Sequence, residues 1–299
     1  MVLYMVGLGL GNERDITLRG KKSCSRHSLF AHTLKSATLF SGLDAVKECT
    51  KVYLEQYTSI LGVDKDRLEK LYGREVTYAD RECVESQAES IYGEAKESNV
   101  AFLVVGDPLC ATTHTDLIIR ARELGIQVEV IHNASVMGAA ASCGLQLYTF
   151  GQTISIPLWD KEMGWTPSSF YEKIAYNRRG GMHTLCLLDI KVKEPDFKEM
   201  AQGRVRYLPP RYMTIGEALT QLLEVEEQTK GGAYTPDTMA VGMARLGQES
   251  QVIIAGTMKE LSGADFGGPL HSLVIAGELH PLEEEMMEMF AYKPNKDTS

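Results

Sequence analysis

The sequence lacks the features of a membrane protein, a secreted protein or a nucleic-acid-binding protein. No uncharged apolar run reaches the roughly 20 residues that a membrane-spanning helix needs, and residues 1–10 have no cationic region like that of a signal peptide. The formal net charge is −9, from 31 basic and 40 acidic residues, whereas a nucleic-acid surface normally carries a basic patch. We therefore expect a cytoplasmic protein that binds neither nucleic acid nor membrane.

Cysteine is sparse, and it is scattered along the chain. The six cysteines form no C-x-x-C pair and show no Cys/His spacing typical of a zinc site; they are Cys24, Cys49, Cys83, Cys110, Cys143 and Cys186. Thiols of a cytosolic protein normally stay reduced. We expect no disulfide framework and no metal site.

The composition that remains is that of a globular protein with more than one domain. Hydrophobic residues make up 44% of the chain and charged residues 24%, which are ordinary values for a globular protein. Because domains usually hold about 100–200 residues, 299 residues predict two. We place an N-terminal α/β domain at 1–134 and a C-terminal α/β domain at 135–292. A polar tail follows at 293–299.

The first half alternates short apolar strands with amphipathic helices. The predicted strands are residues 2–6, 52–57, 75–78, 100–105 and 128–131, and the predicted helices are 43–51, 65–72, 81–98 and 115–124. Residues 100–105 are all apolar, as in a central parallel strand. Strands that alternate with helices predict βαβ units, and hence a parallel sheet.

The second half has a different texture and predicts a mixed sheet with helices. The predicted strands are residues 153–158, 184–190, 239–245, 252–255 and 272–276, and the predicted helices are 135–145, 167–177 and 215–228. Small residues dominate 135–145, which suits a helix in close contact with backbone or ligand. Pro167 stands at the start of its predicted helix, where proline is tolerated.

Glycines punctuate the end of the first predicted strand, at Gly7, Gly9 and Gly11. A strand that ends in glycine lets the backbone turn tightly and lets a ligand approach it closely. The dinucleotide fingerprint G-x-G-x-x-G is nevertheless not met, because Asn12 stands where its third glycine belongs. The pattern predicts a small-molecule site and argues against a nicotinamide or flavin enzyme. A tight turn without a ligand is the simpler alternative.

The segment 106–116, with the sequence G-D-P-L-C-A-T-T-H-T-D, is a more specific signal. Pro108 keeps the preceding Asp107 out of the helical region, so its carboxylate is held at the strand tip. Asp107 with Thr112, Thr113 and His114 gathers polar groups at one strand end, which favours ligand binding over simple helix capping.

Two further histidines stand at the ends of predicted strands. At His132 we expect a buried, hydrogen-bonded side chain. His271 precedes the last predicted strand, where an ordinary edge residue is equally compatible with the sequence.

These segments together resemble the diphthine synthase family of the eukaryotic type, whose members form a methyl ester. It lies in the tetrapyrrole-methylase-like group of S-adenosylmethionine enzymes. The similarity spans residues 7–17, 52–60, 101–116, 130–137, 143–150, 180–193, 209–213, 242–245 and 268–275, and includes G-M-H-T-L-C-L-L-D-I-K-V-K at 181–193 and P-P-R-Y-M at 209–213. The resemblance implies two α/β domains with S-adenosylmethionine in the cleft between them, usually in a homodimer. The implied cofactor-binding residues are Leu10, Asp107, Cys110, Ser135, Val136, Leu188, Leu246 and His271.

Two departures from the family pattern bear on that site. The family normally has glycine at position 110, where this chain has Cys110, and a side chain there would weaken cofactor binding. Residues 21–42 are an atypical insertion, locally basic with Phe30, Leu34 and Phe40 interspersed. The insertion is either a surface element that contacts a partner or extra sequence without a function.

The resemblance implies successive methyl transfer to a modified histidine of elongation factor 2, on its amino group and its carboxylate. A sulfonium is already an activated methyl donor, so the enzyme mainly aligns and desolvates the reactants. An α-amino group has a pKa of about 7.7–8, so no strong base is obligatory. We assign no catalytic residue. The titratable pair closest to the motif is His114 and Asp116, and helix capping is their alternative role.

Other functions remain compatible with the same residues. A methyltransferase of this fold could act on a tetrapyrrole or corrin precursor, although the C-terminal motifs match the diphthine branch better. A non-catalytic binding protein is the second alternative, with its site impaired by Cys110 and the insertion at 21–42. A dehydrogenase is a distant third. Binding of S-adenosylmethionine separates the methyltransferases from the binding protein, and absence of nicotinamide binding excludes the dehydrogenase.

Overall fold

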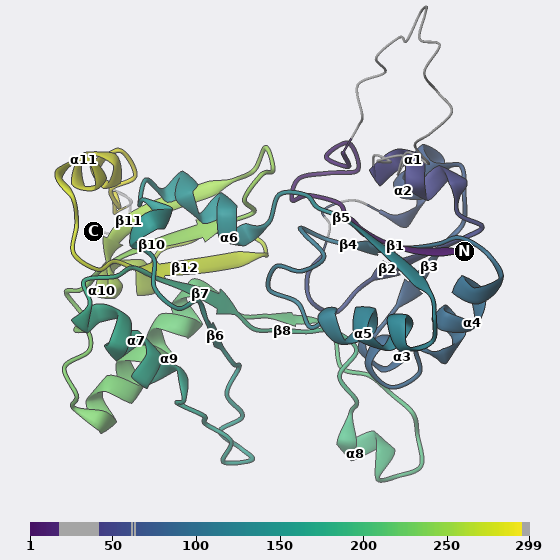
Figure 1. The fold of residues 1–299 in the computed structure, drawn as a ribbon. Helices are drawn as coiled ribbons and strands as arrows, with labels where there is room; N and C mark the ends of the chain where they lie inside the picture. The colour runs from purple at the N-terminus through teal and green to yellow at the C-terminus, as the bar shows by residue number, and fades with distance from the viewer. Residues whose placement is uncertain (18–41, 61, 63, 295–299) are drawn as a thin grey trace, which may run out of the picture. The chain divides into compact units, whose positions relative to one another are not determined.

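The structure is a computed structural model that describes residues 1–17, 42–60, 62 and 64–294 (Figure 1). The chain forms two compact units. The first unit contains Met1–Gln56 and Leu61–Ala134, and the second contains Tyr57–Ile60 and Ser135–Ser299. The short segment Tyr57–Ile60 thus belongs with the C-terminal part of the chain.

A five-stranded parallel sheet forms the centre of the first unit. Its strands are β1 (Val2–Gly7), β2 (Lys51–Glu55), β3 (Val76–Ala79), β4 (Val100–Val104) and β5 (Gln127–Ile131). They lie in the order β3-β2-β4-β1-β5, and every pairing is parallel. Every residue of β4 is buried, as its continuous apolar sequence predicts for a central strand. The predicted parallel sheet is confirmed.

The described helices of the first unit are α1 (Gly42–Glu48), α2 (Lys65–Tyr72), α3 (Arg81–Glu85), α4 (Glu89–Glu97) and α5 (Thr115–Glu123). Residues 81–98 are therefore two helices, and the single helix predicted there is wrong. The amides of Ser86 and Gln87 both bond to the carbonyl of Glu82 and end α3. The apolar face is nevertheless as predicted, since Val84 and Ile91 are both buried.

A five-stranded mixed sheet forms the centre of the second unit. Its strands are β6 (Ile154–Ile156), β7 (Thr184–Leu188), β10 (Met239–Ala244), β11 (Val252–Thr257) and β12 (His271–Ile275), in the order β11-β10-β12-β7-β6. Only the β6–β7 pairing is parallel, so the predicted mixed sheet is confirmed. The strand predicted at 184–190 stops at Leu188. After it, β8 (Ile190–Lys191) pairs with β9 (Arg211–Tyr212) in a separate ribbon.

The hydrophobic pattern predicted α7 and α9 of the second unit but not α8, α10 or α11. The described helices of this unit are α6 (Val136–Ala139), α7 (Phe170–Arg179), α8 (Phe197–Met200), α9 (Ile215–Thr229), α10 (Met258–Ser262) and α11 (Pro281–Met289), with 3₁₀ turns η1 (Ala140–Cys143) and η2 (Leu147–Thr149). The single helix predicted at 135–145 is wrong, because α6 gives way to η1. Pro167 lies before α7 and not in its first turn, and its carbonyl accepts the indole N–H of Trp159.

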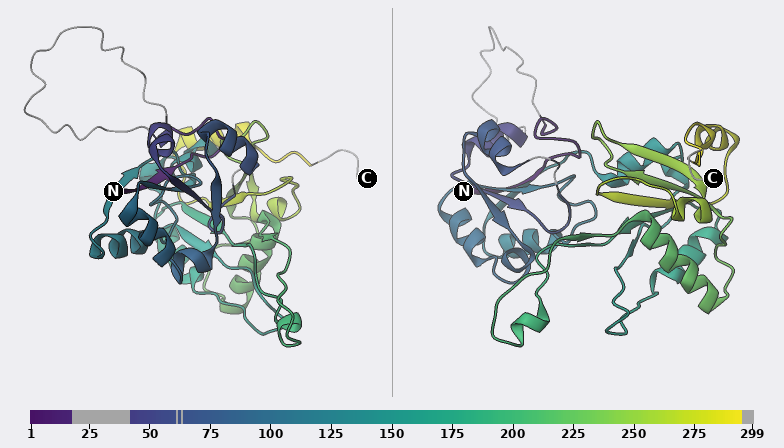
Figure 2. Two further views of the ribbon diagram at one scale, coloured as in Figure 1. Left: turned by 90° about the vertical axis from the view of Figure 1, so that its right-hand side faces the viewer. Right: turned by 180° about the vertical axis from the view of Figure 1, so that it is seen from behind.

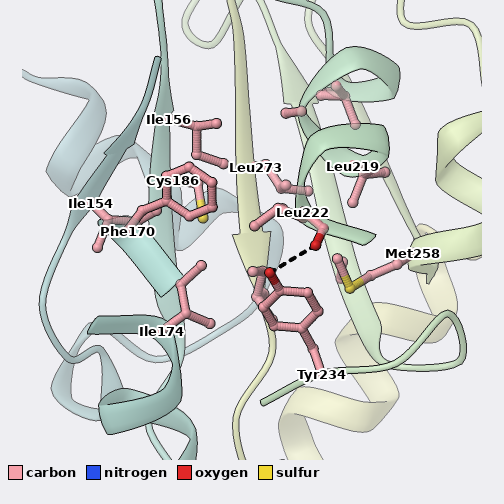
Figure 3. Packing of buried hydrophobic residues seen from close by; sticks show 14 of the residues in the cluster. Ile154, Ile156, Phe170, Ile174, Cys186, Leu219, Leu222, Tyr234, Met258 and Leu273 are labelled. Atoms are coloured by element: carbon pink, nitrogen blue, oxygen red, sulfur yellow. Dashed lines mark hydrogen bonds between the residues drawn. The ribbon is translucent and has the colours of Figure 1, made fainter. Parts of the chain in front are cut away.

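Helices cover both faces of the mixed sheet, α7 and α9 on one face and α6 with α11 on the other (Figures 1 and 2). The first face packs a large apolar core in which Phe170, Ile174, Leu219 and Leu222 meet the strand residue Leu273 (Figure 3). A smaller core lies under α6 and α11. Because strand residues alternate between the faces, the sheet contributes side chains to both cores and is covered on both sides.

Candidate active site

Two glycine turns join the carboxyl ends of β1 and β4. The amide of Gly106 donates to the carbonyl of Gly9 at 2.8 Å, and the amide of Gly9 donates back to Gly106 at 3.2 Å. Both glycines have positive φ, 76° and 83°, which L side chains rarely adopt. At Gly7 an added Cβ would lie 2.7 Å from the carbonyl oxygen of Gly106. The predicted residues Leu10 and Asp107 are the next residues after Gly9 and Gly106, so the paired glycines hold their backbones close together.

Asp107 is the centre of this edge of the sheet. Its side chain is buried, and Oδ1 accepts the amide of Leu109 at 2.9 Å. Oδ2 accepts the amide of Asn133 at 3.1 Å and lies 2.8 Å from Nδ1 of His132. The carboxylate thus ties the turn after β4 to the residues after β5. It does not cap α5, which was its alternative role.

The hydrogen bonds to Asp107 outweigh the cost of burying it. Burial alone would raise the pKa of this carboxyl. The amide of Leu109, the imidazole of His132 and the amide of Asn133 stabilise the ionised form, and the pKa is lowered below its ordinary value. The carboxylate is therefore ionised at neutral pH, and it can only accept hydrogen bonds.

His132 is not the buried histidine that the sequence predicts. Its side chain is 67% exposed, and it is hydrogen-bonded through Nδ1 to the buried Asp107. Because an ionised carboxylate has no proton to give, Nδ1 of His132 carries the hydrogen in this bond. The lone pair of the neutral ring is therefore on Nε2.

Asn133 is a structural residue of the site that no sequence motif indicated. Its Nδ2 donates to the carbonyls of Gly7 and Asp15, both at 3.0 Å. Its Oδ1 accepts the amide of Ala134 at 2.8 Å. One amide side chain thus fastens the end of β1, the loop after it and the end of β5. The available signal was its position, since a polar side chain directly after an apolar strand lies at the sheet edge.

His114 and Asp116, the titratable pair noted in the sequence, are both engaged within the protein. His114 is buried, its Nδ1 lies 3.1 Å from the carbonyl of Pro108, and burial lowers its pKa. Asp116 makes an i,i+4 ion pair with Arg120 at 2.6 Å. His114 occupies the N-cap position of α5 but makes no side-chain capping bond, so the capping role expected as its alternative is not found.

In the second unit, strand register brings three predicted residues to one edge of the mixed sheet. Ala244 pairs with His271, and Leu187 pairs with Ser272. Leu188, the last residue of β7, therefore lies level with His271, and Leu246 follows two residues after the end of β10. Leu188 and Leu246 are 58 positions apart in the sequence, and Leu246 and His271 are 25 apart, so no local pattern joins them.

The imidazole of His271 is held within the second unit. Its Nδ1 accepts the amide of Ile215 at 3.4 Å, and its Nε2 lies 3.1 Å from the carbonyls of both Gly267 and Gly268. Burial lowers its pKa, which favours a neutral ring with its proton on Nε2. Both ring nitrogens are used, so a ligand at this position meets the backbone or the ring face.

Ser135 and Val136 begin the longer segment of the second unit, shortly after His132 and Asn133 in the sequence. Ser135 is the N-cap of α6, and its carbonyl accepts the amide of Ala139 at 2.9 Å. Val136 packs against the same small core that contains Leu246. The predicted cofactor residues thus form two groups. Leu10, Asp107 and Cys110 belong to the first unit, and Ser135, Val136, Leu188, Leu246 and His271 belong to the second.

Of the two departures from the family pattern, Cys110 lies within the described residues and most of the insertion at 21–42 lies outside them. Cys110 is half-buried, and its amide donates to the carbonyl of Asp107 at 3.3 Å, so it is part of the turn itself. Residues 21–41 of the insertion lie outside the described residues. Thr17 and Gly42, which flank residues 18–41, are joined by a 3.0 Å hydrogen bond from the Gly42 amide to the Thr17 hydroxyl.

The chemistry of these residues fits a nucleoside-type methyl donor. Leu10 in the first unit, and Val136 and Leu188 in the second, are half-buried aliphatic residues beside strand or helix ends. Within each unit, apolar surface next to backbone groups suits a purine or a sugar. Both carboxylate oxygens of Asp107 already accept hydrogen bonds from protein groups. This residue would therefore contact the methyl donor through its backbone. Within the described residues we find no cluster of three His, Cys, Asp or Glu side chains able to hold a metal.

The described part of the chain comprises residues 1–17, 42–60, 62 and 64–294. None of its helices combines the length and the apolar character needed to span a membrane.

Comparisons with known proteins agree with the geometry. A family model described as Tetrapyrrole (Corrin/Porphyrin) Methylases matches residues 2–262. The diphthine methyl ester synthase of Dictyostelium discoideum is 49% identical, covering 99% of this chain and 100% of that protein. The enzyme of that name from Homo sapiens is 48% identical, covering 100% and 98%. A crystal structure of diphthine synthase aligns with a TM-score of 0.76 and 31% identity, over 97% of this chain and 96% of that one. The resemblance inferred from the motifs is confirmed.

Proposed function

Because the chain belongs to the tetrapyrrole (corrin/porphyrin) methylase family, we propose that it transfers methyl groups from S-adenosylmethionine to the modified histidine of elongation factor 2. The acceptors are the amino group and the carboxylate of that residue, and the product is diphthine methyl ester. The observation that carries this proposal is the full-length similarity, at about half identity, to proteins named for this reaction. The names of these relatives favour it over a tetrapyrrole substrate.

The geometry supports a site that works by positioning. When bound, S-adenosylmethionine supplies an activated methyl group on a sulfonium. Asp107 and Asn133 hold the backbone at the ends of β1, β4 and β5 in one arrangement. Leu10 of the first unit, and Val136 and Leu188 of the second, each offer half-buried apolar surface. Alignment and exclusion of water supply most of what methyl transfer from a sulfonium requires.

The predicted cellular setting follows from the same proposal. A protein that modifies elongation factor 2 works in the cytoplasm, and we place this chain there as a homodimer. Size-exclusion chromatography with light scattering would show a mass twice the 33.1 kDa of the chain. A monomer that is fully active would contradict the dimer and leave the reaction unaffected.

The proposal is tested by binding and then by transfer. Isothermal titration with S-adenosylmethionine should show saturable binding. Incubation with elongation factor 2 from cells that lack this activity should then add methyl groups to the modified histidine, counted by mass spectrometry. Absence of binding would favour the non-catalytic alternative. Binding without transfer to elongation factor 2 would point to another acceptor, and deletion of residues 21–41 would show whether the insertion obstructs access.

A further inference from the structure

An exposed histidine is oriented by a buried carboxylate at the edge of the parallel sheet. Nδ1 of His132 lies 2.8 Å from Oδ2 of Asp107. The side chain of His132 is 67% exposed, whereas that of Asp107 is 5% exposed. The carboxylate is fixed by two backbone amides, from Leu109 and Asn133. Asp107 therefore holds one ring nitrogen of His132, and the other nitrogen remains available at the surface.

The position of His132 places it among the residues of the candidate site. It directly follows Ile131, the last residue of β5, which pairs in parallel with Val6 of β1. His132 is therefore level with Gly7, at the carboxyl edge from which the glycine turn and Leu10 emerge. Along the chain it stands three residues before Ser135. Its side chain is 67% exposed, so a ligand at this edge can reach it.

Methylation of an amine releases a proton, and the proposed function does not account for where that proton goes. Of the titratable side chains noted at this edge, His114 is buried against the carbonyl of Pro108. Asp116 is paired with Arg120. His132 has an oriented ring with an accepting Nε2, which is the arrangement of a general base.

We propose that His132 accepts, through Nε2, the proton that the acceptor amino group loses during N-methylation. The inference rests on the proposed function and adds a residue to it. Asp107 is the positioning residue, because it holds the ring in the tautomer that leaves Nε2 unprotonated and stabilises the imidazolium that forms.

The balance of the step shows why a base is useful. The nitrogen lone pair of the neutral amine forms a bond to the methyl carbon as the carbon–sulfur bond breaks, and that electron pair leaves with the sulfur as a neutral thioether. The nitrogen product is a cationic ammonium. It must lose a proton to His132 before its lone pair can attack again. The imidazolium then returns the proton to solvent.

Ester formation makes a different demand on the site. An ionised carboxylate attacks through oxygen and carries no proton, so its methylation needs no base. The same enzyme therefore catalyses proton-releasing steps on nitrogen and a proton-free step on oxygen. A residue that only shapes the site would affect both kinds of step, whereas a proton acceptor affects the nitrogen steps alone.

The test compares His132→Gln with the unmodified chain on two acceptors. The first is elongation factor 2 from cells that lack the activity, on which successive N-methylation is followed by mass spectrometry. The second is the product of the unmodified enzyme after mild alkali, which removes the ester methyl and restores a carboxylate beside a fully methylated nitrogen. We expect the variant to slow N-methylation by about 100-fold and to form the ester on the second acceptor at the normal rate.

Further measurements separate a proton acceptor from a structural residue. His132→Ala should regain N-methylation when imidazole is added, and Asp116→Asn should leave the ratio of the two rates unchanged. In ¹⁵N NMR of the histidine rings, the signals that disappear in His132→Gln should be those of an Nδ1-protonated ring. Titration with S-adenosylmethionine should give the same affinity for the variant and the unmodified chain.

Each contrary result overturns the proposal in a recognisable way. Equal loss of N-methylation and ester formation would make His132 a structural or acceptor-binding residue. No loss of either would show that solvent takes the proton. The split appearing in Asp116→Asn instead would transfer the role to that carboxylate. If the unmodified chain transfers no methyl group to elongation factor 2, the proposed function fails, and this inference fails with it.

Discussion

The two units each contain a buried carboxylate bonded to a histidine, but the histidines differ in exposure. In the first unit, Asp107 holds His132, whose side chain is 67% exposed. In the second unit, Glu283 lies 3.3 Å from Nε2 of His183, and both side chains are almost completely buried. In each pair burial opposes ionisation of the carboxylate, hydrogen bonds favour it more strongly, and the pKa is lowered.

The second pair is a structural connection. Nδ1 of His183 accepts the amide of Gly277 at 2.8 Å, so its proton is on Nε2 and points at Glu283. Glu283 also accepts the amides of Gln146 and His280, both at 2.8 Å. Both ring nitrogens of His183 and both carboxylate oxygens of Glu283 therefore make hydrogen bonds within the protein. A carboxylate and an imidazole thus fasten α11 to the rest of one unit and present an oriented base on the other, and solvent access makes the difference.

The largest expected effect comes from breaking the buried pair. Glu283→Ala removes the acceptor of the His183 imidazole and of the Gln146 and His280 amides. We expect a loss of about 3–5 kcal/mol in the free energy of unfolding, measured by urea titration. Glu283→Gln keeps one carbonyl acceptor and should lose clearly less. Equal losses in the two variants would mean that packing, not hydrogen bonding, accounts for the role of Glu283.

Acidification should weaken the fold through the buried histidines. Burial lowers the pKa of His114 and of His183, so both stay neutral in the folded chain. The unfolded chain takes up protons below about pH 6.5. Stability is therefore complete above that pH and falls as the pH drops toward the folded-state values.

The expected slope is up to about 1.4 kcal/mol per pH unit for each of these histidines. Urea titrations between pH 7.5 and 5.5 measure it, in a range above the ordinary titration of the carboxylates. His183→Gln should make the dependence shallower. A free energy of unfolding that is constant over this range would contradict the prediction.

Removing the charge of the exposed pair should have a smaller, local effect. Asp107→Asn replaces one accepting oxygen with an NH₂ group that faces protein donors, and should lower stability by about 1–3 kcal/mol. Hydrogen exchange should increase mainly around the Leu109 and Asn133 amides. Asp116→Asn is the matched control, because its exposed ion pair with Arg120 contributes less than about 1 kcal/mol. Losses of the same size would contradict the central role of Asp107.

The smallest change in stability is expected at Cys110. Cys110→Gly removes a half-buried side chain from the turn that carries Asp107. It should alter the free energy of unfolding by less than about 1 kcal/mol and increase affinity for S-adenosylmethionine. Isothermal titration measures the affinity, and Cys110→Ser is a control of similar size. If glycine and serine leave the affinity equally unchanged, the side chain does not crowd the donor.

Patterns of period and composition predicted the elements whose signals are local. The strand at 100–105 is apolar throughout and is a buried parallel strand, β4. The prediction of one helix over 81–98 was wrong because turn hydrogen bonds to the carbonyl of Glu82 end α3. Hydrophobic periodicity does not reveal such a break. α10 was missed although Thr257 and Glu260 form a capping box, which is a readable sequence signal. The capping box would thus have predicted α10, which the hydrophobic periodicity did not indicate.

The alternation of strands and helices, the glycine turns and the polar residues at strand ends can all be read from the amino-acid sequence. These depend on backbone preferences and on side chains close together in the chain. The exposure of His132, the burial of His183 and the hydrogen bonds of Asp107 to the residues after β5 become visible in the folded chain alone. Exposure and long-range hydrogen bonds depend on which segments pack together. The same carboxylate and imidazole can therefore serve structure or chemistry, and their surroundings in the fold determine which.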